Sequence, residues 1–183
     1  MSARIVVLTG ERGVGKSTVC HKTIDLARTK EYACGGILTL SRPSGARDVL
    51  DVRTGDVHQL TLGHGTDTGV LQGCFRFDPA TLAWGDDVLA SAAGCDLLVV
   101  DELGPLEIER GKGWVGALGV LRASGFTLAL VVVRPELLVQ AQLKLPASAT
   151  TVFTVTRQNR DDLPDVLVTI LEAEASAPSE WRL

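Results

Sequence analysis

The sequence has no excess of positive charge and few aromatic residues. Its 183 residues include 18 Lys and Arg against 22 Asp and Glu, which gives a formal net charge of −4 at pH 7. A protein that binds nucleic acid through the phosphate backbone needs a basic surface. Aromatic residues make up 4% of the chain, and Trp84, Trp114 and Trp181 are too far apart to form a stacking platform. We therefore expect no general nucleic-acid binding.

Long apolar runs and paired cysteines are also missing. No apolar run approaches the roughly 20 residues that a membrane span needs, and the apolar stretch 5–8 is too short for a signal peptide. The four cysteines are Cys20, Cys34, Cys74 and Cys95. They form no Cys-x-x-Cys pair and have no histidine at zinc-site spacing, so we expect buried thiols in a reducing compartment. These absences predict a cytoplasmic protein with no membrane attachment.

What the chain does contain is a regular alternation of two patterns. Apolar, β-rich segments alternate with longer segments of helical period, which predicts an α/β fold: a mostly parallel sheet with helices on both faces. The expected strands are 5–8, 35–40, 97–100, 128–133 and 151–156. The expected helices are 15–30, 78–94, 114–123, 136–142 and 161–173. We expect one domain over residues 1–175 and a C-terminal tail over 176–183.

The segment 36–62 interrupts this alternation. Residues 49–53 and 57–62 alternate between polar and apolar side chains, and Thr54-Gly55-Asp56 lies between them. This pattern predicts an inserted, half-exposed β-hairpin. Four glycines in 63–73 predict that a loop follows it.

A phosphate-binding motif lies between the first expected strand and the first expected helix. The letters GERGVGKS fit the pattern GxxxxGK[ST], whose glycines let backbone N–H groups face an anion at a helix N-terminus. Lys16 is placed to reach the β- and γ-phosphates, and the Ser17 hydroxyl to bind Mg²⁺. The predicted nucleotide-binding residues here are Gly10, Glu11, Arg12, Gly13, Val14, Gly15, Lys16, Ser17 and Thr18.

Two acidic residues end another apolar strand. Asp101 and Glu102 follow Leu97-Leu98-Val99-Val100, at a carboxyl end that a parallel sheet brings near the P-loop. We predict that Asp101 holds the metal and that Glu102 orients or deprotonates a water molecule. Adjacent Asp and Glu are typical of P-loop proteins in which one further strand separates the P-loop strand from the acid-bearing strand. This favours hydrolysis over transfer to an organic acceptor.

Three further segments carry a family resemblance. Residues 101–107 read DELGPLE, residues 155–164 read VTRQNRDDLP, and Gly35-Gly36-Ile37-Leu38-Thr39 precedes the hairpin. With the P-loop, they resemble the small nucleoside-triphosphatase family known from thermophilic microbes and, in vertebrates, as cancer-related nucleoside-triphosphatase. The resemblance runs in order from about residue 4 to residue 171.

The resemblance implies a RecA-like domain that slowly hydrolyses ATP, GTP and other nucleoside triphosphates to the diphosphate. Lys16 and Ser17 fall on the family's phosphate and magnesium residues, and Asp101 and Glu102 on its metal-site and catalytic acids. The sequence departs from the family in the hairpin. An acidic-and-arginine stretch followed by Arg-x-Gly-Phe is usual there, whereas this chain has Thr39-Leu40-Ser41-Arg42 and Arg47-Asp48-Val49-Leu50.

Asn159 and Arg160 fall on a conserved pair of the family after the last strand. Arg160 is our first choice for the cation that stabilises the γ-phosphate, ahead of Arg157, Arg110 and Arg12, although a surface or base-stacking role is an alternative. Asn159 either contacts the nucleotide or caps the last helix, and the two acids that follow it favour the cap.

The sequence predicts a Mg²⁺-dependent nucleoside-triphosphate phosphohydrolase acting on ATP or GTP. One alternative is a small-molecule kinase, although the only segment that could serve as its lid, 36–73, is poor in arginine. Another is a nucleotide-gated assembly protein whose partner binds the altered hairpin. No Asn-Lys-x-Asp guanine signature is present, so the preferred base stays open.

Overall fold

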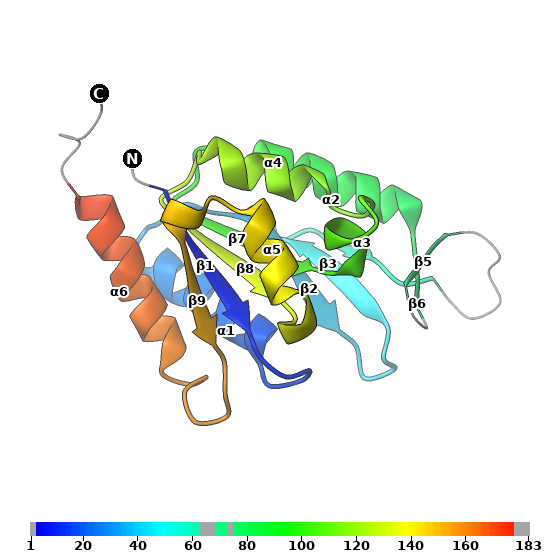
Figure 1. Cartoon of the computed structure of the whole chain (residues 1–183), viewed down its shortest axis with the longest axis horizontal. Helices are drawn as coiled ribbons and strands as arrows, with labels where there is room; N and C mark the ends of the chain where they lie inside the picture. Colours follow the sequence, from blue (N-terminus) through cyan, green and yellow to red (C-terminus); the bar gives the residue numbers. More distant parts are fainter. Residues whose placement is uncertain (1–2, 63–68, 73–74, 178–183) are drawn as a thin grey trace.

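A seven-stranded sheet forms the centre of the molecule. The computed structural model describes residues 3–62, 69–72 and 75–177. The strands are β1 (Arg4–Thr9), β2 (Cys34–Ser41), β3 (Arg47–Asp51), β4 (Val57–Gln59), β5 (Val70–Gln72), β6 (Phe75–Phe77), β7 (Leu97–Leu103), β8 (Leu128–Val133) and β9 (Thr150–Thr154). The main sheet has the order β4-β3-β2-β7-β8-β1-β9, and its five strands from β2 to β9 are parallel (Figure 1). The predicted fold class is confirmed.

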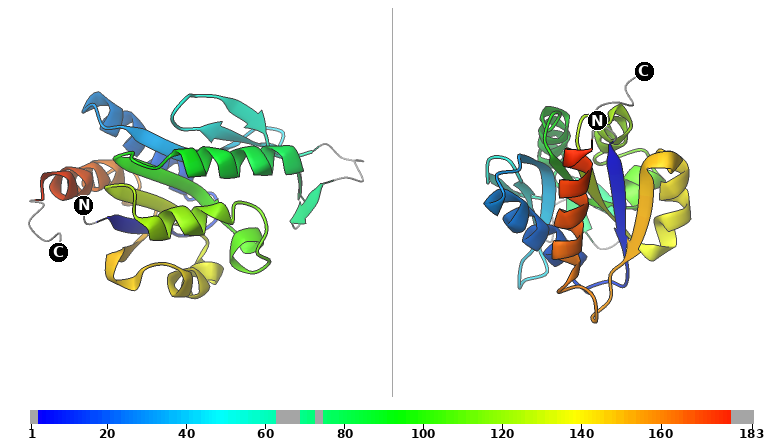
Figure 2. Two further views of the ribbon diagram at one scale, coloured as in Figure 1. Left: turned by 90° about the horizontal axis from the view of Figure 1, so that it is seen from above. Right: turned by 90° about the vertical axis from the view of Figure 1, so that its left-hand side faces the viewer.

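Helices cover both faces of this sheet (Figures 1 and 2). They are α1 (Lys16–Thr29), α2 (Pro79–Ser91), α3 (Pro105–Ile108), α4 (Gly116–Ala123), α5 (Leu138–Lys144) and α6 (Leu163–Ser176), with short 3₁₀ turns η1 (Pro135–Leu137) and η2 (Ala147–Ala149). Helices α1 and α6 pack on one face, and α2, α4 and α5 pack on the other. The helix at the predicted Asp78-Pro79 start is confirmed, because the Asp78 carboxylate accepts hydrogen bonds from the N–H groups of Ala80 and Thr81.

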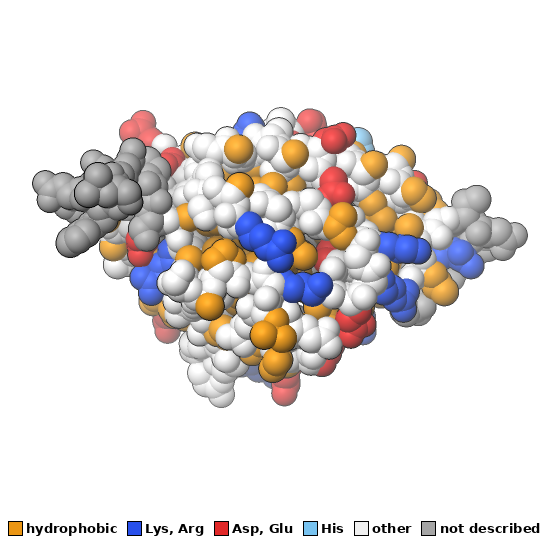
Figure 3. Space-filling view, turned by 45° about the horizontal axis from the view of Figure 1, so that its top comes forward, with side chains coloured by type: hydrophobic (Ala, Val, Ile, Leu, Met, Phe, Trp, Pro, Cys, Tyr) orange, Lys and Arg blue, Asp and Glu red, His pale blue; other side chains and the backbone are white. Residues whose placement is uncertain are grey.

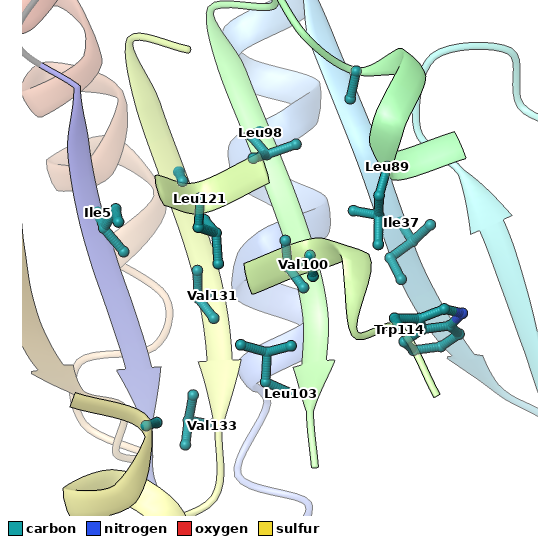
Figure 4. Packing of buried hydrophobic residues seen from close by; sticks show 14 of the residues in the cluster. Ile5, Ile37, Leu89, Leu98, Val100, Leu103, Trp114, Leu121, Val131 and Val133 are labelled. Carbon is teal, nitrogen blue, oxygen red and sulfur yellow. The ribbon is translucent and has the colours of Figure 1, made fainter. Parts of the chain in front are cut away.

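The central strands are apolar throughout because both of their faces are buried. In β1, Ile5 and Val7 belong to the core on the face covered by α2, α4 and α5, whereas Val6 and Leu8 belong to the core on the face covered by α1 and α6. Figure 4 shows the first of these two cores, in which side chains of β1, β7 and β8 meet Leu121 of α4. This two-sided packing fixes the strand ends, and therefore the residues that follow them, at one edge of the sheet.

The region predicted as an inserted hairpin is instead a continuation of the main sheet. The antiparallel β3–β4 pair is present as predicted, but β3 also pairs antiparallel with β2 from Ile37 to Ser41. Beyond its last pairing with β7, at Ile37, strand β2 continues to pair with β3 as far as Ser41. The β2–β3 hairpin therefore extends beyond the point where β2 stops pairing with β7.

Several expected boundaries were wrong. Within the predicted loop 63–73, Val70–Gln72 forms strand β5 and pairs with β6, while 63–68 and 73 lie outside the described residues. Helix α6 begins at Leu163, two residues later than predicted, because Pro164 suits its first turn. It continues to Ser176, which the prediction assigned to the tail, and residues 178–183 also lie outside the described part.

Glu107 connects the two ends of the turn that follows β7. Its side chain is buried, with 5% of its surface exposed. Its Oε2 accepts a hydrogen bond from Gly104 N at 2.9 Å, and its Oε1 accepts one from Trp114 N at 3.0 Å. Burial raises the pKa of Glu107, although these N–H groups oppose the rise. The carboxylate thus connects the ends of the 104–114 segment.

We expect Glu107→Ala to lower the free energy of unfolding by about 2–4 kcal/mol, because two buried N–H groups lose their acceptor. Urea unfolding at neutral pH measures the change. The matched control is Glu109→Ala, which removes an exposed carboxylate two residues away and should stay within about 0.5 kcal/mol of the wild type. Equal losses in the two variants would contradict this role for Glu107.

On the face that Figure 3 presents, Lys and Arg side chains form small groups near the middle and toward the right-hand end, and acidic side chains lie on the same face. Among the described residues, no helix is both long and apolar enough to cross a membrane. Cys20, Cys34 and Cys95 are buried free thiols, and burial raises the pKa of each, while Cys74 lies outside the described residues.

Candidate functional site

The glycine-rich loop between β1 and α1 has the backbone of a phosphate cradle. Gly10 has a φ of 142° and Gly15 a φ of 113°, and both lie in the range that favours glycine. A Cβ atom on Gly10 would come within 2.5 Å of the Val155 carbonyl oxygen, so the loop also passes too close to its neighbour for any other residue. Helix α1 begins at Lys16, so its unpaired N-terminal N–H groups face the loop.

Lys16 is held in this loop by its own backbone. Its Nζ donates to the carbonyl oxygens of Gly10, at 2.7 Å, and Glu11, at 2.9 Å. Burial lowers the pKa of Lys16, while the charges of Glu102 and Asp101 oppose that change and Arg134 reinforces it. The ammonium group, the two acids and Arg134 thus share one electrostatic environment.

Asp101 is nearly inaccessible, with 1% of its surface exposed. Its Oδ2 accepts a hydrogen bond from Thr39 N at 3.3 Å, and the Thr39 hydroxyl donates to the Asp101 carbonyl. Burial raises the pKa of Asp101 to about 7, although a hydrogen bond from Ser17 opposes the rise. Because burial disfavours the ionised form of this carboxyl group, a nearby cation would stabilise that form.

Glu102 follows Asp101 through a cis peptide bond and forms an ion pair with Arg134. Arg134 directly follows β8, which lies between β1 and β7, as the adjacent Asp-Glu pair predicted. Its Nε and Nη2 approach the same Glu102 oxygen, Oε1, at 2.7 and 2.6 Å. The side chains are partly exposed, Glu102 by 21% and Arg134 by 33%. The pair therefore lies at the border between the protein and the solvent-filled site.

One cavity of about 800 Å³ joins these groups. Its floor and first wall come from the P-loop, α1 and the ends of β7 and β8, and its second wall comes from the β2–β3 hairpin. Arg47 of β3 lines this second wall, and its guanidinium lies 5.0 Å from the ring centroid of Phe75 in β6, a cation–π contact. The predicted nucleotide-binding residues that line the cavity are Gly10, Arg12, Gly13, Gly15, Lys16, Ser17 and Thr18.

The remaining predicted site residues have other surroundings. Glu11 contributes the carbonyl that Lys16 binds, and Val14 is buried with its carbonyl 3.2 Å from Arg160 Nη1. Arg160 therefore lies against the P-loop but is not among the cavity-lining residues. Of the other candidate arginines, Arg12 lines the cavity, whereas Arg110 donates to the Leu71 carbonyl, away from it.

The prediction that Asn159 caps the last helix was wrong. Its Oδ1 accepts a hydrogen bond from Thr156 N at 2.8 Å, and its Nδ2 donates to the Thr154 carbonyl at 2.9 Å. The N-cap position of α6 is occupied by Asp162. Because the Asn159 amide closes the loop after β9, it is committed to that loop, and it does not line the cavity.

Ser17 and Asp101 fit a magnesium ion in kind and number. Mg²⁺ prefers oxygen ligands and typically takes one or two carboxylates together with substrate phosphates and water. No group of three or more His, Cys, Asp or Glu side chains able to hold a metal occurs in the described parts of the chain. A single buried carboxylate beside a serine hydroxyl, next to a phosphate cradle, would fit a metal ion that binds together with a nucleotide.

Sequence reasoning missed Arg134 and gave Arg47 no role. Arg134 directly follows the apolar run 128–133, and the position just after a parallel strand is where binding residues gather. The position of Arg134 after an apolar run could have indicated a site residue. It is a weak indication while the order of the strands in the sheet is unknown. Arg47 was noted only as part of the altered hairpin, and nothing in its local sequence indicates that it reaches the cavity.

Comparisons with known proteins agree with this geometry. Residues 5–168 match the family described as NTPase. The chain is 30% identical over 174 residues to the nucleoside-triphosphatase THEP1 of Methanopyrus kandleri, covering 91% of this chain and 95% of that protein. It is 32% identical over 167 residues to the THEP1 of Methanosarcina barkeri, covering 87% and 92%.

Two solved structures have the same fold. The solution structure of a human cancer-related nucleoside triphosphatase superposes with a TM-score of 0.68 at 24% identity, over 96% of this chain and all of that one. THEP1 from the hyperthermophile Aquifex aeolicus gives a TM-score of 0.67 at 17% identity, over 92% and 99%. At these identities the two structures support the architecture alone.

Proposed function

The chain belongs to the NTPase family, and from this we propose that it hydrolyses the γ-phosphate of nucleoside triphosphates, ATP and GTP among them, with Mg²⁺. Nucleoside-triphosphatase activity follows from the family and from the names of the curated relatives. The kinase and assembly-protein alternatives are not favoured by these comparisons. The nucleotide range, the metal and the residue roles are our proposals.

The observation that carries the proposal is the shared cavity. Lys16, Ser17, Asp101 and Glu102 line it together, and Asp101 is almost completely buried. In our proposal the P-loop N–H groups and Lys16 bind the β- and γ-phosphates, and Ser17 and Asp101 hold the magnesium ion. When bound, the ion neutralises charge on the phosphate oxygens.

Glu102 is the proposed general base. A water oxygen forms a bond to the γ-phosphorus while the bond from that phosphorus to the β–γ bridging oxygen breaks. The water proton passes to the Glu102 carboxylate, and the nucleoside diphosphate leaves with the bridging oxygen. Gly10, Gly13 and Gly15 orient the phosphates through backbone groups, and Thr18 contacts the α-phosphate. Arg160 and Asn159, which lie outside the cavity, are proposed to support the P-loop and the adjoining loop rather than contact phosphate.

Lys16→Ala tests the phosphate site. We expect this variant to bind ATP and GTP at least about tenfold more weakly and to lose about 10²-fold or more in kcat/KM, since its charge meets the phosphates in both the bound state and the transition state. Phosphate release measured with and without Mg²⁺, with ATP and GTP in parallel, gives the activity. Titration with a non-hydrolysable analogue gives the affinity.

Lys30→Ala is the matched control for this test. Lys30 follows the opposite end of α1, where it pairs with Glu172 on the surface, so its loss should leave kcat/KM within about twofold. The proposal would fail if the wild type released no phosphate from any common nucleoside triphosphate in Mg²⁺. It would also fail if Lys16→Ala and Lys30→Ala behaved alike.

A further inference from the structure

The close contacts of the ion pair between Arg134 and Glu102 are made at one carboxylate oxygen, Oε1. Both Arg134 nitrogens, Nε and Nη2, approach Oε1, at 2.7 and 2.6 Å. Within the described part of the chain, no hydrogen-bond donor is recorded at Oε2. The arginine therefore fixes the orientation of the carboxylate while leaving its second oxygen available to another partner.

The backbone on both sides of Arg134 is held by pairing and by a hydrogen bond. The preceding residue, Val133, is buried and is paired with Leu103 of β7, the residue that follows Glu102. On its other side Pro135 begins η1, and the Arg134 carbonyl accepts a hydrogen bond from Leu137 N at 3.0 Å. The two charged residues thus extend from neighbouring strand ends whose relative position is set by the sheet.

We infer that Arg134 is a positioning residue: it holds Glu102 by Oε1 so that Oε2 can accept the proton of the attacking water. This inference rests on the proposed function, in which Glu102 is the general base. A free glutamate side chain samples several rotamers, and a base that is displaced by about 1 Å can lose about 10²-fold in rate. A guanidinium that restrains the carboxylate removes this freedom before the nucleotide binds.

A direct role for Arg134 at the γ-phosphate is the competing interpretation. Arg134 lines the same cavity as Lys16, so a guanidinium that released Glu102 could approach phosphate. The two roles make different predictions. A residue that acts through Glu102 loses its effect when Glu102 can no longer act as a base, whereas a residue that binds the γ-phosphate keeps its effect.

The experiment is a double-mutant cycle with Arg134→Gln and Glu102→Gln in the full chain. We expect Arg134→Gln to lower the single-turnover rate of ATP hydrolysis by about 10- to 10²-fold, with the affinity for a non-hydrolysable analogue within about threefold of the wild type. In the Glu102→Gln background, the same change should alter the residual rate less than about twofold. Arg134→Lys, which keeps the charge but loses the planar fork, should recover part of the rate.

Three results would overturn the inference. A wild-type or faster rate in Arg134→Gln would show that Arg134 does not position the base. A fall of equal size in both backgrounds would assign Arg134 to the phosphate, and so would a large loss of analogue affinity. Arg122→Ala is the control, because this exposed arginine donates to the Lys144 carbonyl away from the cavity and should leave the rate unchanged.

Failure of the inference is distinguishable from failure of the proposed function. If the inference alone fails, the wild type still hydrolyses nucleotide and Glu102→Gln still impairs it. If the proposed function fails, the wild type releases no phosphate, and there is no wild-type rate with which the variants of the cycle can be compared. A thermal unfolding curve for each variant separates a loss of positioning from a loss of folded protein.

Discussion

Glu102→Gln should bind nucleoside triphosphate about as tightly as the wild type and hydrolyse it about 10³-fold more slowly, the loss typical of removing a general base. Glutamine keeps the size of the side chain and an oxygen that can still accept from Arg134, which touches Glu102 at Oε1. It cannot take a proton from water. The expected signature is therefore a fall in kcat with an affinity that changes less than about threefold.

Single-turnover phosphate release and analogue titration measure the two quantities separately. The control is Glu136→Gln, which removes an acidic charge from the lining of the same cavity and lies close enough to Lys16 to influence its pKa. We expect this control to stay within about threefold of the wild-type rate. A similar loss in both variants would mean that the site needs negative charge in general, and that Glu102 is not the base.

Asp101→Asn should have opposite effects on stability and on activity. Burial raises the pKa of Asp101 to about 7, above the ordinary value of 3.8. Between these two pH values the folded protein holds a proton that the unfolded chain has released, so the free energy of unfolding falls as the pH rises through this window. Above pH 7 the folded protein bears the full cost of an ionised, buried carboxylate. At about 1.4 kcal/mol per pKa unit, that cost is at most about 4 kcal/mol.

Without nucleotide or Mg²⁺, Asp101→Asn should therefore be the more stable protein at pH 8, by about 1–4 kcal/mol, and this advantage should disappear near pH 4. Urea unfolding of both proteins across pH 4–8 measures the difference. In Mg²⁺ and ATP, the variant should hydrolyse at least about 10²-fold more slowly because it lacks the carboxylate that we propose as the metal ligand. A variant less stable than the wild type at pH 8 would contradict the burial argument. Full activity would contradict the metal role.

The sequence predicted the parts of the site that depend on one strand and the residues beside it. The P-loop follows β1 and the acids end β7, and parallel strands bring their carboxyl ends to one edge, so Lys16, Ser17 and Glu102 could be expected to meet. Because the central strands are buried on both faces, their sequences are continuous apolar runs. Such runs alternating with helical segments predict the α/β class. The roles of these residues remain predictions.

Features that depend on contacts between distant segments were not predictable in the same way. Arg134 meets Glu102 because β8 pairs with β7, and an arginine after an apolar run is ordinary unless that pairing is known. The reach of Arg47 into the cavity depends on how far β2 and β3 extend beyond the sheet. For Asn159, loop closure and helix capping compete for the same amide group, and local sequence does not decide between them.

In the proposed mechanism, the phosphate cradle and the residues that act on the attacking water follow different strands of the sheet. The phosphate cradle follows β1, whereas Glu102 lies at the end of β7 and Arg134 directly follows β8. If Arg134 positions Glu102 as inferred, substitutions at the end of β8 change the rate of cleavage and leave the affinity for nucleotide nearly unchanged. In that case a single position after β8 sets how long a bound triphosphate persists, independently of the nucleotide concentration at which the site is half filled.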